Sequence, residues 1–329
     1  MDADVARLTR IMAVAGVSPG QVAGFRRLEG GTFNTVYLGR LVDGTGLVLK
    51  VAPDPREPVL KYEEGILATE AMYYRLAARC PGVRVPSLVH LDTGDAIVPG
   101  GFLVMSECPG TSWYELRTRL AEPERAEVRA ELGRQVARLH TITGPAFGYP
   151  ALSAGPLRPS WREAFADMVD AILTDARRFA VELPRPATRI RDLFTAMAPV
   201  LDEVTVPVLV HFDMWDGNIL VDPDAGPIGG VIDAERAFWG DPLAEFVSLA
   251  LFTEIQDDHA LLQGYRSAGG SLTFDDAALL RLSLYRAYLY LIMWVETAPR
   301  RYDEKRRARL RSLVFHPLAE ILDTWAARA

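Results

Sequence analysis

The chain has 329 residues, of which 49% are hydrophobic and 24% charged, a composition typical of globular proteins and not of fibres or disordered chains. Its 43 acidic and 36 basic residues give a formal net charge of −7. This balance argues against a nucleic-acid partner, because nucleic-acid binders present basic surfaces to phosphates. Cys80 and Cys108 lie far apart, so neither a disulfide framework nor a zinc–thiolate site is predicted. We expect a cytoplasmic monomer or homodimer.

No membrane span is expected from the two most apolar stretches. IMAVAGV, near the N-terminus, is short and follows two acids and two arginines, which favours a surface helix over a signal peptide. LSLYRAYLYLIMWVE is interrupted by Arg286 and closed by Glu296, so it is too short and too polar at its ends to cross a bilayer.

The first third of the chain predicts a small sheet with one helix. FNTVYLGRL and LVLKVA are strand-like runs joined by the turn formers DGTG, which is a hairpin pattern. The expected strands cover residues 33–41, 47–52, 85–92 and 101–107, and the expected helix covers 59–79. With a short N-terminal helix, these elements form one lobe over residues 1–108.

Long helical patterns dominate residues 109–329. Helices are expected at 122–141, 159–181, 187–203, 241–270 and 275–297, and a β-rich island interrupts them at 206–234. The predicted fold is therefore α+β and two-lobed. A small sheet lobe is joined near 107–112 to a larger, mainly helical lobe that carries a β-hairpin insert. A small ligand is expected in the cleft between the lobes.

The loop HFDMWDGN, residues 211–218, places acids, an amide and an imidazole between two apolar runs. We interpret His211 as structural, because nothing nearby supplies companion metal ligands. If the hairpin after the loop turns between Ala225 and Gly226, Asn218 lies opposite Asp233, and cross-strand partners have Cβ atoms about 4.5–5.5 Å apart. Their oxygens would suit Mg²⁺. Asp213 would stay free to deprotonate an acceptor hydroxyl, which is the arrangement that phosphoryl transfer requires.

HFDMWDGNIL resembles the catalytic loop, HxDxxxxN, of the aminoglycoside phosphotransferase family and its protein-kinase-like relatives, and VIDAERAFWGDPLAEF resembles the family's metal-binding segment. The chain has Phe where protein kinases have Arg in the first motif, and Asp-Ala-Glu in place of Asp-Phe-Gly, which points to small-molecule kinases. The resemblance implies a protein-kinase-like fold that uses ATP and Mg²⁺. It also implies that Asp213 is the catalytic base, that Asn218 and Asp233 hold metal, and that Glu245 braces the loop.

A nucleotide-binding pair is predicted in the small lobe. Lys50 shares one face of its strand with Val48, and Glu70 falls within the apolar stripe of the following helix. A Lys50–Glu70 ion pair would present the ammonium to the α- and β-phosphates of ATP. Glu63 is the alternative partner for Lys50. The simplest other explanation is a lysine on an edge strand and a glutamate on the surface of the helix, with no ion pair between them.

Two further segments are assigned to nucleotide binding by the resemblance. EGGTFNTVY corresponds to the glycine-rich loop, in which Gly30 and Gly31 would let the backbone approach phosphate, although a simple turn explains it equally well. FLVMSECPG resembles the hinge, with Met105 at its entrance and the backbone of Glu107 and Cys108 facing adenine. A strand followed by a turn also explains this segment.

The sequence favours an ATP-dependent kinase that phosphorylates a hydroxyl of a small molecule, with an amine-bearing antibiotic such as an aminoglycoside as the first choice. A metabolic kinase of the choline or amino-sugar type, a catalytically silent nucleotide-binding regulator and a metal-dependent hydrolase are the alternatives, the last without an HExxH motif. Acids and aromatics between 235 and 303 suggest a cationic acceptor, in line with the negative charge. The aromatic members are Tyr285, Tyr288 and Trp294, whose helical spacing also fits a core.

Overall fold

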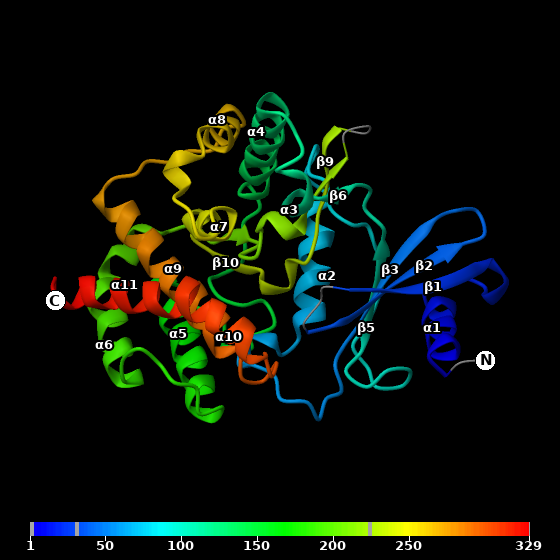
Figure 1. Cartoon of the computed structure of the whole chain (residues 1–329), viewed down its shortest axis with the longest axis horizontal. Coiled ribbons are helices and arrows are strands. Elements are labelled where there is room, and N and C mark those ends of the chain that lie inside the picture. The colour runs from blue at the N-terminus through cyan, green and yellow to red at the C-terminus, as the bar shows by residue number, and fades with distance from the viewer. Residues whose placement is uncertain (1–2, 30–32, 223–225, 329) are drawn as a thin grey trace.

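The computed structural model describes residues 3–29, 33–222 and 226–328. Its N-terminal part is a five-stranded antiparallel sheet in the order β1-β2-β3-β5-β4 (Figure 1). The strands are β1 (Val22–Leu28), β2 (Thr35–Leu41), β3 (Gly46–Val51), β4 (Leu88–Asp92) and β5 (Phe102–Ser106). Strand β1 was not predicted, because its sequence, VAGFRRL, is interrupted by a glycine and two arginines and its burial does not alternate regularly.

Helices cover both faces of this sheet. Helix α1 (Ala3–Val14) packs Leu8, Ile11 and Met12 against the face that carries Leu49. Helix α2 (Ile66–Ala77), which follows the short 3-10 turn η2 (Lys61–Glu63), lies on the opposite face. Because neighbouring residues of a strand point to opposite faces, β3 directs Lys50 towards α2 while Leu49 is fully buried beneath α1.

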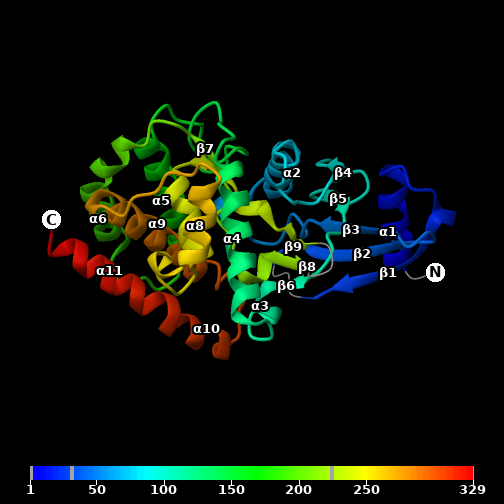
Figure 2. The same ribbon diagram turned by 90° about the horizontal axis from the view of Figure 1, so that it is seen from above.

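The rest of the chain is mainly helical and lies beside the sheet (Figures 1 and 2). Its helices are α3 (Trp113–Leu116), α4 (Glu122–Leu139), α5 (Trp161–Arg178), α6 (Ala187–Met197), α7 (Glu245–Leu249), α8 (His259–Ser267), α9 (Asp276–Val295), α10 (Glu304–Leu310) and α11 (His316–Ala326). The expected fold class, a mixed fold with an N-terminal sheet and a helical C-terminal region, is confirmed.

The single helix expected over 241–270 is wrong. The chain forms the short α7 and the separate α8, joined by irregular residues and the 3-10 turn η7 (Ile255–Asp257). Phe252 adopts a left-handed conformation, with φ of 66°, and the side chain of Asp258 accepts a hydrogen bond from Leu261 N at the start of α8. A left-handed residue ends a helix, and a capping aspartate begins the next one.

Two small sheets inside the helical region hold the loop 211–218. Strand β8 (Ile219–Asp222) pairs with β9 (Gly226–Val231) and with β6 (Thr111–Ser112), and β7 (Val208–Val210) pairs with β10 (Phe238–Gly240). The loop therefore leaves the two-stranded sheet of β7 and β10 at Val210 and enters the three-stranded sheet of β6, β8 and β9 at Ile219.

Helix α9 is, among the described residues, long and apolar enough to cross a membrane by length and composition. Of its most apolar window, 67% is buried inside the protein, as in the central helix of a folded core. Tyr285 and Tyr288 on this helix are each at most 1% exposed.

His140, which follows α4, is a buried histidine at the contact between α4 and α8. Its Nδ1 lies 2.9 Å from Tyr265 Oη, and burial lowers the pKa of its ring to about 3. A carboxylate oxygen of Glu245 lies 4.0 Å from Nε2, but an ion pair would need a proton that burial disfavours. The ring is therefore neutral in the folded protein.

We expect this histidine to weaken the fold in acid. The unfolded ring has a pKa near 6.5, so only the unfolded state binds the proton as the pH falls from about 6.5 towards 3, and stability is lost over that range. Between pH 7.5 and 5.5 the contribution is about 1 kcal/mol. His140→Gln should therefore lose less unfolding free energy than the wild type over this interval in urea titrations. His259→Gln, an exposed control, should behave as the wild type; an equal loss for His140→Gln would contradict the assignment.

Candidate active site

The backbone of the loop 211–218 is held by a buried carboxylate. Phe212 is fully buried and adopts φ of 61°, a conformation that a bulky residue rarely takes. Glu245 accepts hydrogen bonds from His211 N at 2.8 Å and from Phe212 N at 3.0 Å. Its side chain therefore satisfies both amides at the turn, which is the bracing contact expected of it.

His211 lies beneath the loop. Its Nε2 is 3.1 Å from the carbonyl oxygen of Ile232, and its Nδ1 accepts a hydrogen bond from Asp213 N at 3.2 Å. Burial lowers the pKa of the ring to about 4, so the ring is neutral, and these partners require the proton on Nε2. His211 thus connects the loop to the end of β9.

Asp213 is positioned by two side chains. Asn218 Nδ2 donates to Asp213 O at 2.8 Å and lies 3.3 Å from Asp213 Oδ2, and Arg236 Nη1 donates to Oδ1 at 3.0 Å. Burial raises the pKa of Asp213 to about 7, against the opposing effect of Arg236. A carboxylate held in place with a pKa near neutrality has the properties of a general base.

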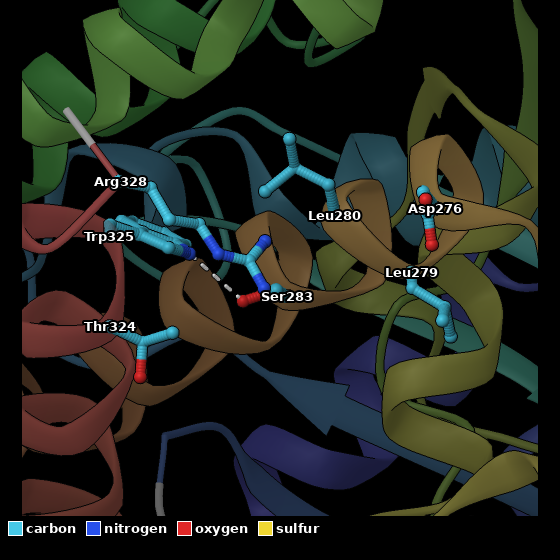
Figure 3. Close-up of a pocket in the computed structure, with 7 residues that line it drawn as sticks. All are labelled: Asp276, Leu279, Leu280, Ser283, Thr324, Trp325 and Arg328. Atoms are coloured by element: carbon cyan, nitrogen blue, oxygen red, sulfur yellow. Dashed lines mark hydrogen bonds between the residues drawn. The ribbon is translucent and has the colours of Figure 1, made fainter.

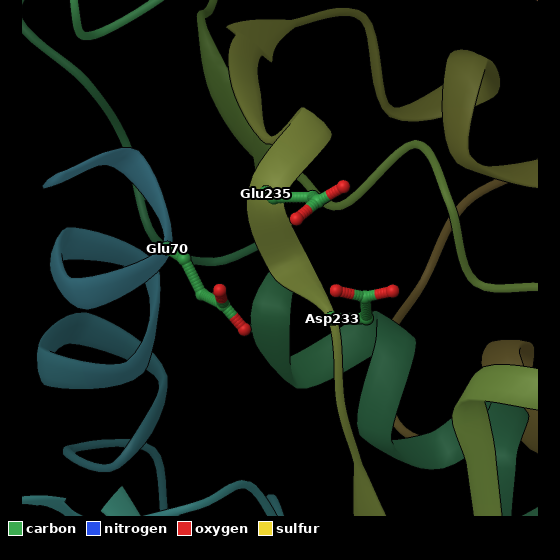
Figure 4. A group of neighbouring side chains, drawn as sticks. All are labelled: Glu70, Asp233 and Glu235. Carbon is green, nitrogen blue, oxygen red and sulfur yellow. The ribbon is translucent and has the colours of Figure 1, made fainter. Parts of the chain in front are cut away.

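Lys50 and three carboxylates form the second half of the site. Lys50 Nζ lies 2.8 Å from both oxygens of Glu70, contacts Asp233 Oδ1, and lies 3.9 Å from Glu235. Figure 4 shows Glu70 on α2 facing Asp233 and Glu235, with ligand oxygens that all lie within 4.8 Å of one another. Burial alone would lower the pKa of Lys50, but the three carboxylates raise it above its ordinary value. The expected Lys50–Glu70 pair is present in the structure.

The alternative partner, Glu63, lies elsewhere. Its Oε1 accepts a hydrogen bond from Arg300 Nη2 at 2.7 Å, so it pairs with the helical region and not with Lys50. Val48 and Met105 are cross-strand partners on β3 and β5, and Met105 is 3% exposed.

The expected hairpin register is wrong by one residue. Ile219 pairs with Val231, and Ile232 N donates to Asn218 O at 3.0 Å, so Asn218 lies opposite Ile232. A bulge in the pairing of β8 and β9 shifts the register. Asp233 comes one residue later, in a left-handed conformation with φ of 67°, and its carboxylate turns towards Lys50.

The segment expected to face adenine is partly engaged. Glu107 N donates to Gly46 O at 3.0 Å, and its carboxylate pairs with Arg40 at 2.8 Å, so the amide of Glu107 is not open to a base. This corrects the expectation for that donor and leaves the carbonyl of Glu107 and the amide of Cys108. Gly30 and Gly31 lie outside the described residues.

The linker after Glu107 lies directly on the β8–β9 hairpin. A Cβ atom added at Gly229 would lie 2.1 Å from Pro109 O, and one added at Gly230 would lie 2.6 Å from Cys108 Sγ. Side chains at either position would collide with the linker. These two glycines therefore let the Cys–Pro–Gly segment pack onto the strand that ends near Asp233.

Gly229→Ala should separate the linker from the hairpin. We expect a loss of about 1–3 kcal/mol in unfolding free energy, the usual cost of overpacking, together with a lower kcat/KM for the reaction catalysed at this site. Gly24→Ala, on β1, is the matched control because its added Cβ meets no atom within 4 Å. Chemical denaturation of both variants measures the difference, and equal stabilities would show that the linker tolerates displacement.

Comparison with known proteins identifies the family. The model of the phosphotransferase enzyme family matches residues 24–282, which is more than half of the chain. The chain belongs to the phosphotransferase enzyme family. The expected resemblance and the expected enzyme class, a phosphotransferase, are thereby confirmed.

Individual relatives of this phosphotransferase are distant. The probable ketoamine kinase of Synechocystis sp. is 26% identical over 74% of this chain and 75% of its own length. Acyl-CoA dehydrogenase family member 10 of Mus musculus is 22% identical over 73% of this chain. The match spans only 21% of that mouse protein, so this chain corresponds to about a fifth of it.

Solved structures share the fold of this phosphotransferase over nearly all of the chain. A protein of Thermobifida fusca assigned as a fructosamine-3-kinase is 22% identical and superposes with a TM-score of 0.70, covering 100% of both chains. A mutant aminoglycoside phosphotransferase APH(4)-Ia, bound to ADP and hygromycin B, is 17% identical with a TM-score of 0.63, covering 95% of this chain and 97% of its own. At these identities, the structures establish the fold.

The donor set of the phosphotransferase site suits a magnesium ion. Asp233, Glu235 and Glu70 bring three carboxylates together, and Lys50 is the cation in contact with them, so negative charge is in excess. The adjoining loop carries Asn218, whose amide has a further oxygen and whose Nδ2 donates to Asp213 O. Hard oxygen ligands of this kind are those that Mg²⁺ prefers, so the residues fit the metal that the family implies.

Three residues near the site were not assigned from the sequence: Asn34, Glu235 and Arg236. Asn34 Nδ2 donates to Glu235 Oε2 at 2.9 Å, which joins the start of β2 to the metal-binding segment. Glu235 could have been suspected from its place two residues after Asp233. Arg236 had no signal of its own, because an arginine in a loop is normally solvated.

A cavity of about 390 Å³ lies away from these residues, between α9 and α11 (Figure 3). It is lined by Asp276, Leu279, Leu280, Ser283, Thr324, Trp325 and Arg328. Trp325 Nε1 donates to Ser283 Oγ at 3.1 Å within it. The lining includes one acid and one arginine but no nucleophile–base pair, so this cavity is not a candidate for the chemistry.

Proposed function

We propose that this protein is an ATP-dependent kinase that transfers the γ-phosphate to a hydroxyl group of a small metabolite. The observation that carries the proposal is the contact between charged residues of the sheet lobe and charged residues of the helical lobe. Lys50 and Glu70 come from the sheet lobe, and Lys50 contacts Asp233 of the helical lobe. Asp213 and Asn218 lie on the loop next to that segment. A phosphate-binding cation and a separate base are the two parts that a kinase needs.

On the nucleotide side, Lys50 would contact the α- and β-phosphates, and Glu70 would hold it in place. Val48 and Met105 would pack against adenine, whose polar edge would meet the carbonyl of Glu107 and the amide of Cys108. Gly30 and Gly31 are proposed to lie over the phosphates. Bound Mg²⁺, held by Asp233, Asn218 and Glu235, would neutralise the developing charge on the phosphates.

On the acceptor side, Asp213 would orient the hydroxyl and take its proton. Arg236 fixes one carboxylate oxygen and Asn218 fixes the backbone of the loop, so the base loses little freedom when the acceptor binds. Residues around Asp213 are largely buried, which strengthens electrostatic interactions at the moment of transfer.

The acceptor is proposed to be a metabolite of the ketoamine type, in place of the antibiotic expected first. The acidic and aromatic residues that suggested a cationic pocket have other partners. Tyr285 donates to Asp241 Oδ2 at 2.6 Å, and Glu254 pairs with Arg286 at 2.7 Å. The probable ketoamine kinase of Synechocystis sp., which is 26% identical to this chain, supports a metabolite as the acceptor.

The test is a coupled kinase assay with Mg·ATP and a panel of acceptors: fructosyl-lysine, glucosamine, choline, hygromycin B, streptomycin and a neutral sugar. We expect the highest kcat/KM for fructosyl-lysine, with no turnover when Mg²⁺ is chelated. Turnover of an aminoglycoside with the highest kcat/KM would restore the antibiotic assignment. ATP binding by calorimetry without turnover of any acceptor would favour the silent regulator.

A further inference from the structure

A chain of buried charges leads away from Asp213 through Arg236, and its members beyond Arg236 have no part in the chemistry described above. Arg236 Nη2 donates to Glu296 Oε2 at 2.9 Å, and Arg300 Nη1 lies 3.1 Å from the same oxygen. Arg300 Nη2 then donates to Glu63 Oε1 at 2.7 Å. The charges alternate in sign along the whole path from Asp213 to Glu63.

These four residues come from three distant parts of the fold. Arg236 lies three residues after Asp233, and Glu296 and Arg300 lie at the end of α9 and one turn beyond it. Glu63 belongs to η2, just before α2, the helix that carries Glu70. The chain thus joins the proposed base to the segment that leads into the nucleotide-binding helix.

Stability alone does not account for this arrangement. The side chains of Arg236, Glu296, Arg300 and Glu63 are 9%, 8%, 9% and 2% exposed. Removing such charges from water costs as much as their attraction returns, so well-packed apolar residues would often be as stable. A planar guanidinium does, however, fix the direction between its partners, and Arg236 donates through Nη1 to Asp213 and through Nη2 to Glu296.

We infer that Glu296 is a positioning residue, which holds the guanidinium of Arg236 so that the carboxylate of Asp213 faces the acceptor. The inference rests on the proposed kinase function. Glu296 binds Arg236 on one side and Arg300 on the other through the same oxygen. Without it, Arg236 can rotate away from Asp213, and the loop keeps its fold while the base loses its direction.

Glu296→Gln should lower kcat about tenfold, as supporting-residue changes commonly do, and leave the Kd for ATP within twofold. The decisive measurement combines it with Asp213→Asn. Because Glu296 acts through Asp213, Glu296→Gln should not lower the residual rate of Asp213→Asn further. Rates are measured with the best acceptor of the panel and, for the same site, by ATP hydrolysis without acceptor.

Loss of an anion between two arginines also destabilises the fold, so a second variant separates the two effects. Glu63→Gln/Glu296→Gln/Arg300→Gln removes every charge of the path beyond Arg236, so that none of its members is left without a partner; it should recover stability but not kcat, since Arg236 still lacks its anchor. Glu254→Gln, which breaks an ion pair with Arg286 on the same α9, is the control and should leave kcat unchanged.

The inference is wrong if Glu296→Gln lowers the residual rate of Asp213→Asn by the same factor as it lowers the wild-type rate, or if Glu296→Gln is fully active. Either result leaves the kinase assignment intact. Recovery of kcat together with stability in the triple variant would also overturn it, because the role would then be structural. Full activity of Asp213→Asn would instead remove the proposed base itself.

Discussion

Asp213→Asn should lower kcat by about 10²–10⁴-fold, the contribution of a positioned general base. The amide keeps the volume of the carboxylate and can still accept from Arg236, so the loop should stay folded. It cannot take a proton from the acceptor hydroxyl. The Kd for Mg·ATP should change little, because the proposed role of Asp213 is on the acceptor and the proposed phosphate-binding group is Lys50. Steady-state kinetics and calorimetry provide the two readouts.

Asp167→Asn is a suitable control for this experiment, because Asp167 pairs with Arg158 at 2.6 Å on the surface of α5 and has no contact with the loop. Its kcat should match that of the wild type. Full activity of Asp213→Asn on a proven acceptor would show that another group takes the proton.

Lys50→Ala and Glu70→Ala should each impair nucleotide use. Lys50→Ala should also destabilise the fold by about 3–5 kcal/mol, since it leaves the buried Glu70 without its cation, whereas Glu70→Ala should cost less because Lys50 keeps its contact with Asp233. The double variant should cost much less than the sum of the two, because no unpaired charge remains from that pair. Nucleotide use should not return with stability. Urea titration measures the coupling, and calorimetry with Mg·ATP measures the binding.

The chain supplies its own control for this cycle. Lys61 and Glu64 form an ion pair at the same distance, 2.8 Å, but their side chains are 49% and 47% exposed. Exposed pairs of this kind contribute about 0–1 kcal/mol, so their alanine cycle should show little coupling. Strict additivity for Lys50 and Glu70 would mean that the buried contact does not exist in solution.

The sequence was most informative where regular elements carry the site. Alternation along β3 and the apolar stripe of α2 placed Lys50 and Glu70 on facing surfaces, and the structure has them 2.8 Å apart. Strand and helix periods are fixed by backbone geometry, so a residue's face can be read from its position. The functional roles of Lys50, Glu70, Asp213, Asn218 and Asp233 stay predictions until the variants are measured.

Features that depend on irregular backbone or on charge pairs between distant residues could not be predicted from the sequence. The pairing of β8 with β9 is irregular between Leu220 and Asp222, and Asn218 lies opposite Ile232; irregularities of this kind have no reliable sequence signal. The path from Arg236 to Glu63 joins residues far apart in the sequence, so no periodic pattern reveals it. Tyr288, which suggested an acceptor pocket, is 1% exposed, as its helical spacing also allowed.

The contacts on either side of the Cys–Pro–Gly linker determine where the molecule can bend. Glu107 is tied to the sheet through Gly46 and Arg40, whereas Cys108 and Pro109 lie against Gly230 and Gly229 of the hairpin. Glu107 is thus held by the sheet, whereas the next residue, Cys108, lies against the β8–β9 hairpin. A rocking motion of the sheet over the helices would take Glu107 with the sheet and leave Cys108 with the hairpin. The two sets of contacts therefore meet at the Glu107–Cys108 peptide unit, which is itself planar, so any such motion would have to turn the backbone torsions beside it.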